Sequence, residues 1–129
     1  MPRPCFAFTA VWSAYVLLLG ALSLMPGGDV PSFDLSDKLA HSVAYALMAG
    51  LAPWSQAESK GAWIAFFAAV LYGAALELGQ GALAEERHPD VWDGLANAAG
   101  AAAGAIFRRH VDKRRMNEQF RRQVMQGKD

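Results

Sequence analysis

Ionisable and amide side chains recur at helical spacing in three separate apolar stretches of this 129-residue chain. The steps between them are three or four residues, so each row lies along one face of a helix. The three rows are Asp37, His41 and Tyr45, then Glu77 and Gln80, and then Asp90, Asp93 and Asn97, with Lys38 and Arg87 beside them. Carboxylates, imidazoles and amides of this kind bind polar ligands, coordinate metals or transfer protons.

The stretches that carry these rows are apolar enough to be membrane helices. Asp, Glu, Lys and Arg are absent from residues 4–28, 39–57, 61–76 and 94–107. A helix needs about 17–25 residues to span the hydrocarbon core of a bilayer. The first two intervals reach this length, and the last two do so only if polar neighbours such as Glu77 and Asp93 lie within the membrane boundary. The sequence therefore predicts an all-α fold, an integral membrane bundle of four transmembrane helices over residues 5–25, 36–51, 61–83 and 90–107.

Two alternatives to this fold concern the first apolar stretch. A soluble four-helix bundle requires a polar face on each helix, and between Phe6 and Met25 the most polar side chains are those of Thr, Ser and Tyr. A cleaved signal peptide is the second alternative, with Ala21 and Ser23 as a small-x-small cleavage site. The apolar run of about 20 residues is longer than the 7–15 typical of a signal peptide. An uncleaved membrane helix fits the stretch better.

Lysine and arginine are divided unevenly between the two predicted membrane faces. If both termini are cytoplasmic, that face holds Arg3, Lys60 and eight residues of the C-terminal tail, whereas the other face holds Lys38 and Arg87. Cytoplasmic loops of membrane proteins are enriched in Lys and Arg. We therefore predict that both termini lie in the cytoplasm.

The chain divides into a membrane domain, residues 5–107, and a basic cytoplasmic tail, residues 108–129, whose formal charge is +5. Met116, Phe120 and Val124 recur at a spacing of four among the arginines of the tail. This pattern is typical of an amphipathic helix on an anionic membrane surface, and a plain solvated extension is the alternative.

In this orientation the three polar rows meet near the extracytoplasmic end of the bundle, at similar depth. An ionisable side chain in the hydrocarbon costs about 2.5–3.5 kcal/mol, so such groups face the interior, where they pair or line a watery pocket. One interpretation is an internal clasp that fixes helix packing, in which Lys38 or Arg87 neutralises Glu77 or Asp93. The other is an outward-facing polar pocket that holds a ligand. The number of polar groups exceeds what packing requires, which favours the pocket.

Small residues continue the last row towards the other end of its helix. Gly100 and Gly104, with Ala99 and Ala103, form a small-xxx-small face that allows another helix to approach closely. We assign this face to helix packing.

Taken together and in this order, the motifs resemble the VanZ-like family of bacterial membrane proteins. The similar pattern is Asp37-Lys38-x-x-His41-x-x-x-Tyr45, then Glu77-x-x-Gln80, then Arg87-x-x-Asp90-x-x-Asp93-x-x-x-Asn97-x-x-Gly100-x-x-x-Gly104. The resemblance covers residues 24–104 and implies a multi-pass protein of the bacterial inner membrane with a role at the cell envelope. The family takes its name from a protein associated with teicoplanin resistance, a role that need not extend to every member.

Three functions are open at this point. In the first, the pocket binds the head group of an envelope lipid, a lipid-linked precursor or a glycopeptide. Lys38 and Arg87 would then contact phosphate or carboxylate, and His41, Gln80 and Asn97 would hydrogen-bond. In the second, the chain is a membrane enzyme acting on a lipid-linked phosphate or sugar. In the third, it is a structural or assembly subunit.

Binding without catalysis is the function that we favour, because the usual catalytic signatures, such as HExxH, GxSxG and a glycine-rich phosphate loop, are absent from the sequence. The competent metal ligands are His41, Glu77, Asp90 and Asp93, and the imidazoles near the site are those of His41 and His88. From the sequence we assign no metal, no cofactor, no catalytic residue and no nucleic-acid partner.

Overall fold

The chain forms four helices in a computed structural model that describes residues 6–25, 35–53, 59–83 and 90–127. The helices are α1 (Phe6–Leu24), α2 (Leu35–Gly50), α3 (Ser59–Leu83) and α4 (Val91–Gln126), and these ranges contain no strand. The predicted all-α fold is therefore confirmed for the described residues.

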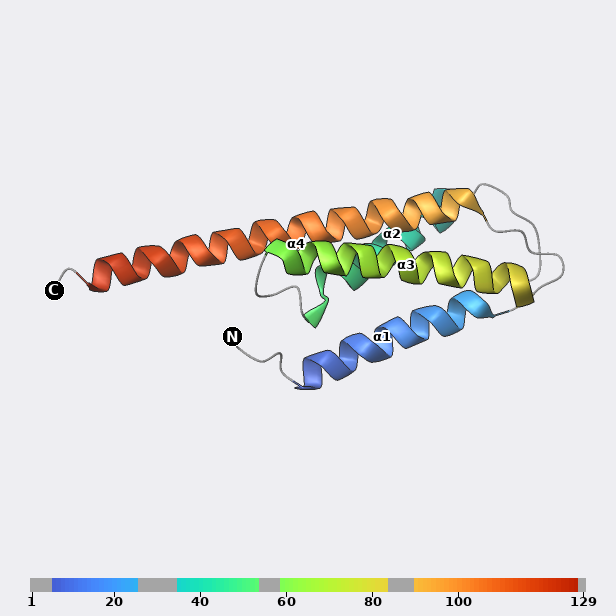
Figure 1. The fold of residues 1–129 in the computed structure, drawn as a ribbon, viewed down its shortest axis with the longest axis horizontal. Coiled ribbons are helices and arrows are strands. Elements are labelled where there is room, and N and C mark those ends of the chain that lie inside the picture. The colour runs from blue at the N-terminus through green and yellow to red at the C-terminus, as the bar shows by residue number, and fades with distance from the viewer. Residues whose placement is uncertain (1–5, 26–34, 54–58, 84–89, 128–129) are drawn as a thin grey trace.

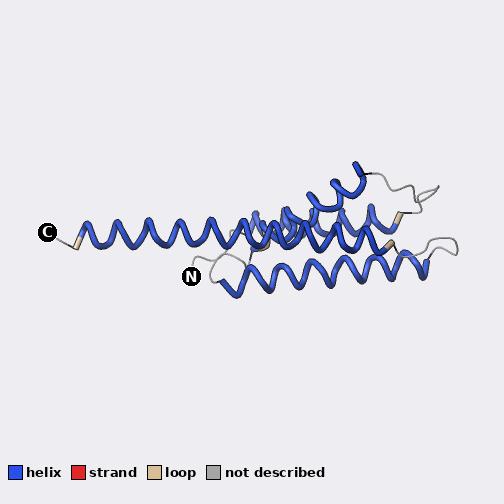
Figure 2. Tube along the Cα trace, turned by 90° about the horizontal axis from the view of Figure 1, so that it is seen from above, coloured by secondary structure: helices blue, strands red, loops and turns tan. Residues whose placement is uncertain are grey.

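The helices lie side by side, and α2 and α4 run in the same direction (Figures 1 and 2). These two helices make the most extensive contact in the bundle, and α3 packs against both in the opposite direction. Helix α1 lies along α2 and α3 with a smaller contact. The N-terminal ends of α2 and α4 consequently meet the C-terminal ends of α1 and α3 at one end of the bundle (Figure 1).

The boundaries of the first three helices lie within two residues of the predicted ones, because proline and capping residues mark them. Helix α2 ends three residues before Pro53, whose ring cannot continue a helix. Helix α4 begins after Asp90, whose carboxylate accepts a hydrogen bond of 2.9 Å from the backbone N–H of Trp92. This is the usual role of an aspartate at a helix N-cap.

The predicted end of the fourth helix near Phe107 is wrong, since α4 continues without interruption to Gln126. No glycine or proline occurs between Gly104 and Gly127, and the intervening arginine, lysine, glutamine and methionine are good helix formers. An ion pair of 3.1 Å between Arg108 and Asp112, four residues apart, supports the same segment. The 36-residue helix extends beyond the other three (Figure 1). For the tail to lie flat on a membrane, α4 would have to bend, and it is one continuous helix from Val91 to Gln126. The surface position of the tail therefore stays a prediction.

The interior of the bundle consists of small side chains, and the large apolar side chains point outward. Among the residues that the structure describes, seven of the nine buried hydrophobic ones are alanines, and the other two are Tyr45 and Met48. Large apolar side chains are exposed along all four helices, for example Leu17, Val43 and Phe67. In water-soluble proteins large aliphatic residues are the ones most often buried, whereas small residues at the contacts are typical of helices that pack in a membrane.

Two of the described helices are long and apolar enough to cross a membrane. They are α1, over Phe6–Leu24, and most of α3, over Lys60–Leu83. This finding weakly indicates a membrane protein.

Candidate functional site

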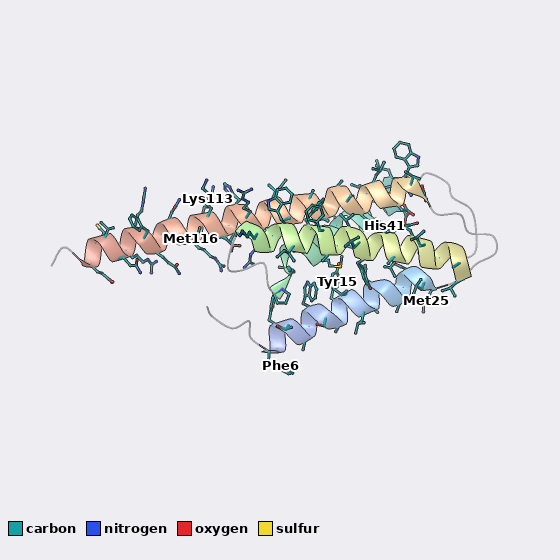
Figure 3. All side chains as sticks on the ribbon, in the orientation of Figure 1. Phe6, Tyr15, Met25, His41, Lys113 and Met116 are labelled. Carbon is teal, nitrogen blue, oxygen red and sulfur yellow. The ribbon has the colours of Figure 1, made fainter. Side chains whose placement is uncertain are left out.

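Polar side chains of three helices meet where α2 and α4 begin and α3 approaches its end. We call this group the polar cluster; its members are Asp37, Lys38, His41, Glu77, Asp90, Asp93 and Asn97. His41 lies at this end of the bundle, between the helices (Figure 3). The cluster forms because α2 and α4 are parallel, so the first turns of both helices place their polar side chains at the same level.

Lys38 connects the first turn of α2 to the start of α4. Its Nζ donates a hydrogen bond of 2.8 Å to Oδ2 of Asp90 and a second one to Oδ1 of Asp93, and it lies 3.8 Å from Oδ2 of Asp37. The lysine side chain is only 12% exposed, so the ammonium is enclosed by carboxylates. The Lys38–Asp93 pair matches one of the pairings in the clasp that the sequence offered as an alternative, whereas Asp90 is a partner that the clasp did not include.

Asp90 is held by contacts from all three helices of the cluster. Beyond its bonds to Lys38 and Trp92, its backbone N–H donates to Oε2 of Glu77 at 3.3 Å. The hydrogen bond from Lys38, followed by the one from the Trp92 N–H, lowers the pKa of the Asp90 carboxyl below its ordinary value. Asp90 therefore remains ionised and serves as a cap and an ion-pair partner.

His41 is oriented by a buried amide. Its Nδ1 lies 3.0 Å from Oδ1 of Asn97, whose residue is only 4% exposed. Because that oxygen is an acceptor, the hydrogen bond places a ring proton on Nδ1, and in the neutral ring the lone pair is then on Nε2. Nε2 faces Oδ1 of Asp37 at 3.9 Å, which is too far for a hydrogen bond.

The polar cluster has a large excess of hydrogen-bond acceptors and of negative charge. The four carboxyl groups are those of Asp37, Glu77, Asp90 and Asp93, and one ammonium, that of Lys38, lies among them. With His41 neutral, these described groups carry four negative charges and one positive charge, a formal net charge of −3. Such a site attracts cations and hydrogen-bond donors.

Two other predicted site residues, Tyr45 and Gln80, lie outside this group. Tyr45 is buried in the core beside Gly73, and Gln80 donates instead to the backbone carbonyl of Ser23 at the end of α1. Arg87 falls outside the described residues, as does His88.

The glycines assigned to packing lie where α2 and α4 come closest. A Cβ on Gly100 would overlap the backbone of Ser42, and a Cβ on Gly104 would overlap the backbone of Ala46. The hydroxyl of Ser42 donates to the carbonyl of Ala96 at 3.0 Å across the same contact.

An apolar cavity of about 150 Å³ lies between α1, α2 and α3, away from the polar cluster. Its walls are formed by alanines together with Trp12, Val16, Met48 and Tyr72. Among the described residues the members of the cluster differ in exposure, from 54% for the side chain of Asp37 and 12% for that of Lys38 to 4% for Asn97. An outward-facing polar pocket over it stays a prediction.

Sequence reasoning missed the hydrogen bonds that attach α1 to the bundle. Trp12 and Tyr15 donate to the carbonyls of Met48 and Ala44 at 3.0 and 2.9 Å, and Tyr15 points from α1 towards the other helices (Figure 3). Tyr72 donates in return to the carbonyl of Val16 at 2.7 Å. A tryptophan or tyrosine in an apolar helix carries a polar group that needs a hydrogen-bond partner. These residue types were therefore the sequence feature from which contacts of α1 with other helices could have been predicted.

Comparison with known proteins gave no match: no family model, no curated protein and no solved structure is similar to this chain.

Proposed function

We propose that all four helices cross a membrane, with residues 91–107 as the fourth span. The support is that α2 and residues 91–107 of α4 expose large apolar side chains, as the two most apolar helices, α1 and α3, also do. The exposed face of α2 carries Leu39, Val43 and Leu47 at spacings of four. The proposed fourth span exposes Leu95, Ile106 and Phe107. The polar groups of α2 and α4, by contrast, face each other in the cluster, where a membrane protein keeps its ionisable residues.

In the proposed orientation both termini are cytoplasmic and the polar cluster lies at the extracytoplasmic end. The division of Lys and Arg supports it, since ten of the twelve would lie on the cytoplasmic face. Together with the sequence resemblance, this orientation leads us to propose a VanZ-like multi-pass protein of the bacterial inner membrane. Tolerance of a glycopeptide such as teicoplanin is one role that the proposal includes.

The proposed function is to bind the head group of an envelope lipid or lipid-linked precursor at the polar cluster, without catalysis. The observation that carries it is the convergence of side chains from three helices on one partly exposed, acceptor-rich group. Lys38 was expected to contact a phosphate, but its ammonium is already bonded to Asp90 and Asp93. The described groups instead favour head groups rich in donors, such as sugar hydroxyls or an ammonium, which carboxylates accept well.

A second candidate function is a purely structural one, in which the cluster only fastens α2 to α4. The enclosed ammonium of Lys38 and the close approach at Gly100 favour it. Replacement of Asp37 can distinguish the two functions. Its side chain is 54% exposed and lies 3.8 Å from Nζ of Lys38, too far for a hydrogen bond, so it is open to a ligand and contributes little to the fastening of α2 to α4.

Replacing Asp37 by asparagine is expected to reduce the affinity for an amine- or sugar-bearing envelope lipid by about tenfold, because one charge-assisted hydrogen bond to the head group is lost. Native mass spectrometry of the purified chain with extracted envelope lipids, in the presence of EDTA, measures the retained lipid. Asp112→Asn is the matched control: it makes the same change near the middle of α4, away from the cluster, where the carboxylate pairs with Arg108, and it should retain lipid normally. Equal retention by both variants, with unchanged melting temperatures, would favour the structural function.

A further inference from the structure

We propose that Asp37, His41 and Asp93 form a binding site for a divalent transition-metal ion such as Zn²⁺. The three side chains offer one imidazole nitrogen and two carboxylate oxygens, and these atoms lie within 4.8 Å of one another. Imidazole suits zinc and other transition metals, whereas Mg²⁺ and Ca²⁺ prefer oxygen ligands alone. The mixed donor set therefore selects a first-row metal.

The orientation of His41 is that of a metal ligand. In most metal sites the ligating histidine donates its other ring N–H to a carbonyl or carboxylate oxygen, which fixes the ring. Here Nδ1 bonds to the buried amide oxygen of Asn97 at 3.0 Å, and Nε2, the atom that would bind the ion, faces Asp37. The gap of 3.9 Å between Nε2 and Oδ1 of Asp37 is slightly wider than the roughly 3–3.5 Å between two ligands of one ion with bonds of about 2.0–2.2 Å. Binding would draw the three ligand atoms together from separations of up to 4.8 Å, and the side chain of Asp37, at 54% exposed, is the least confined of the three.

The backbone positions of the three ligands suit chelation. Asp37 and His41 are four residues apart on one face of α2, the spacing at which two helical side chains hold one ion. Asp93 faces them from the first turn of α4. The ion would join the same two helices as Lys38 does, and the exposed side of Asp37 gives it a path of entry from solvent. Three protein ligands leave a coordination position open for water or for an external group.

The charge of the polar cluster supports a cation as the ligand. A divalent ion would change the formal net charge of the described groups from −3 to −1. It would have to share Asp93 with the ammonium of Lys38, which already bonds to Oδ1 of that residue. Lys38 therefore competes with the ion, and its removal should strengthen metal binding.

This inference goes beyond the proposed function and does not depend on it, because ion binding is measured on protein without lipid and lipid binding is measured in EDTA. Either can fail while the other holds.

Titration of the purified full chain with Zn²⁺, after removal of metals with EDTA, tests the site. We expect one ion per chain, with an affinity that falls at least tenfold in Asp37→Asn and in His41→Gln. Glutamine is chosen at position 41 because its amide can still donate a hydrogen bond to Asn97 but it lacks the ring nitrogen that would bind the ion. The matched controls Asp112→Asn and His110→Ala on the tail should bind as the original chain does. Unchanged affinity in His41→Gln, or a loss confined to His110→Ala, would overturn the proposal by showing adventitious binding.

A second measurement uses the competition between Lys38 and the ion. At the same free Zn²⁺ concentration, the ion should raise the melting temperature of Lys38→Met by more than it raises that of the original chain. An ion that binds only the folded state stabilises it by RT ln(1 + [L]/Kd), which increases as the affinity increases. An equal or smaller shift in Lys38→Met would contradict a shared Asp93. If Lys38→Met does not fold, the Asp37 and His41 variants decide the question alone.

Discussion

Replacing Gly100 by alanine is expected to separate α2 from α4 and to destabilise the chain by several kcal/mol, enough to prevent folding at growth temperature. The added Cβ would overlap the carbonyl oxygen of Ser42 and lie 2.7 Å from its carbonyl carbon and its Cα. Backbone atoms cannot move aside as the end of a flexible side chain can, so the helices must part. Their contact is the largest in the bundle, and overpacking of an interior costs about 1–3 kcal/mol even where neighbours adapt.

Gly94 on the same helix provides the matched control for this prediction, since a Cβ there meets nothing within 4 Å. Gly94→Ala should be neutral or stabilising by up to about 1 kcal/mol, because alanine is the better helix former. Melting of both variants in detergent, followed by size-exclusion chromatography, compares them. Equal melting temperatures for Gly100→Ala and Gly94→Ala would show that α2 and α4 do not approach each other at this point.

Replacing Lys38 by methionine is expected to destabilise the chain by about 2–3 kcal/mol, since loss of one partner leaves enclosed carboxylates without a counter-charge. The carboxylates of Asp90 and Asp93, which are 29% and 19% exposed, would then repel each other. The thermal unfolding of the purified variant measures the loss. Lys60→Met, which removes a lysine from the exposed start of α3, should change stability by less than about 0.5 kcal/mol.

The partners of Lys38 can be tested in the same series. Neutralising Asp90 and Asp93 to asparagine in the Lys38→Met background should restore much of the lost stability, because no unpaired charge then remains in the cluster. A triple variant that is less stable than Lys38→Met would contradict the clasp between α2 and α4.

The sequence was most informative about local structure. Charge-free runs bounded by proline, glycine and capping residues located α1, α2 and α3 closely, and the helical spacing of polar residues identified most members of the cluster. The same reasoning failed at the end of α4. Polarity after Phe107 was interpreted as the end of a helix, although polarity marks the end of an apolar surface and not the end of helical hydrogen bonding.

Pairing within the cluster could not be predicted, because spacing fixes the face on which a residue lies but not its neighbour across the interface. Gln80 shares a helix face with Glu77, yet it bonds to the carbonyl of Ser23, since α1 covers that part of α3. The association of Asp37 with His41 and Asp93 likewise depends on the parallel register of α2 and α4. That register is set by the close contact at Gly100 and is not visible in any one helix.

Cysteine labelling from the two sides of the membrane tests the proposed position of the polar cluster most directly. The chain has a single cysteine, Cys5, so a Cys5→Ser background allows one probe at a time. Leu35→Cys, at an exposed position two residues before Asp37, should react with a membrane-impermeant maleimide in intact spheroplasts. Gln119→Cys on the tail should react only after the membrane is permeabilised. If Leu35→Cys reacts only after permeabilisation, the polar cluster does not face the outside, and an extracytoplasmic binding site is excluded.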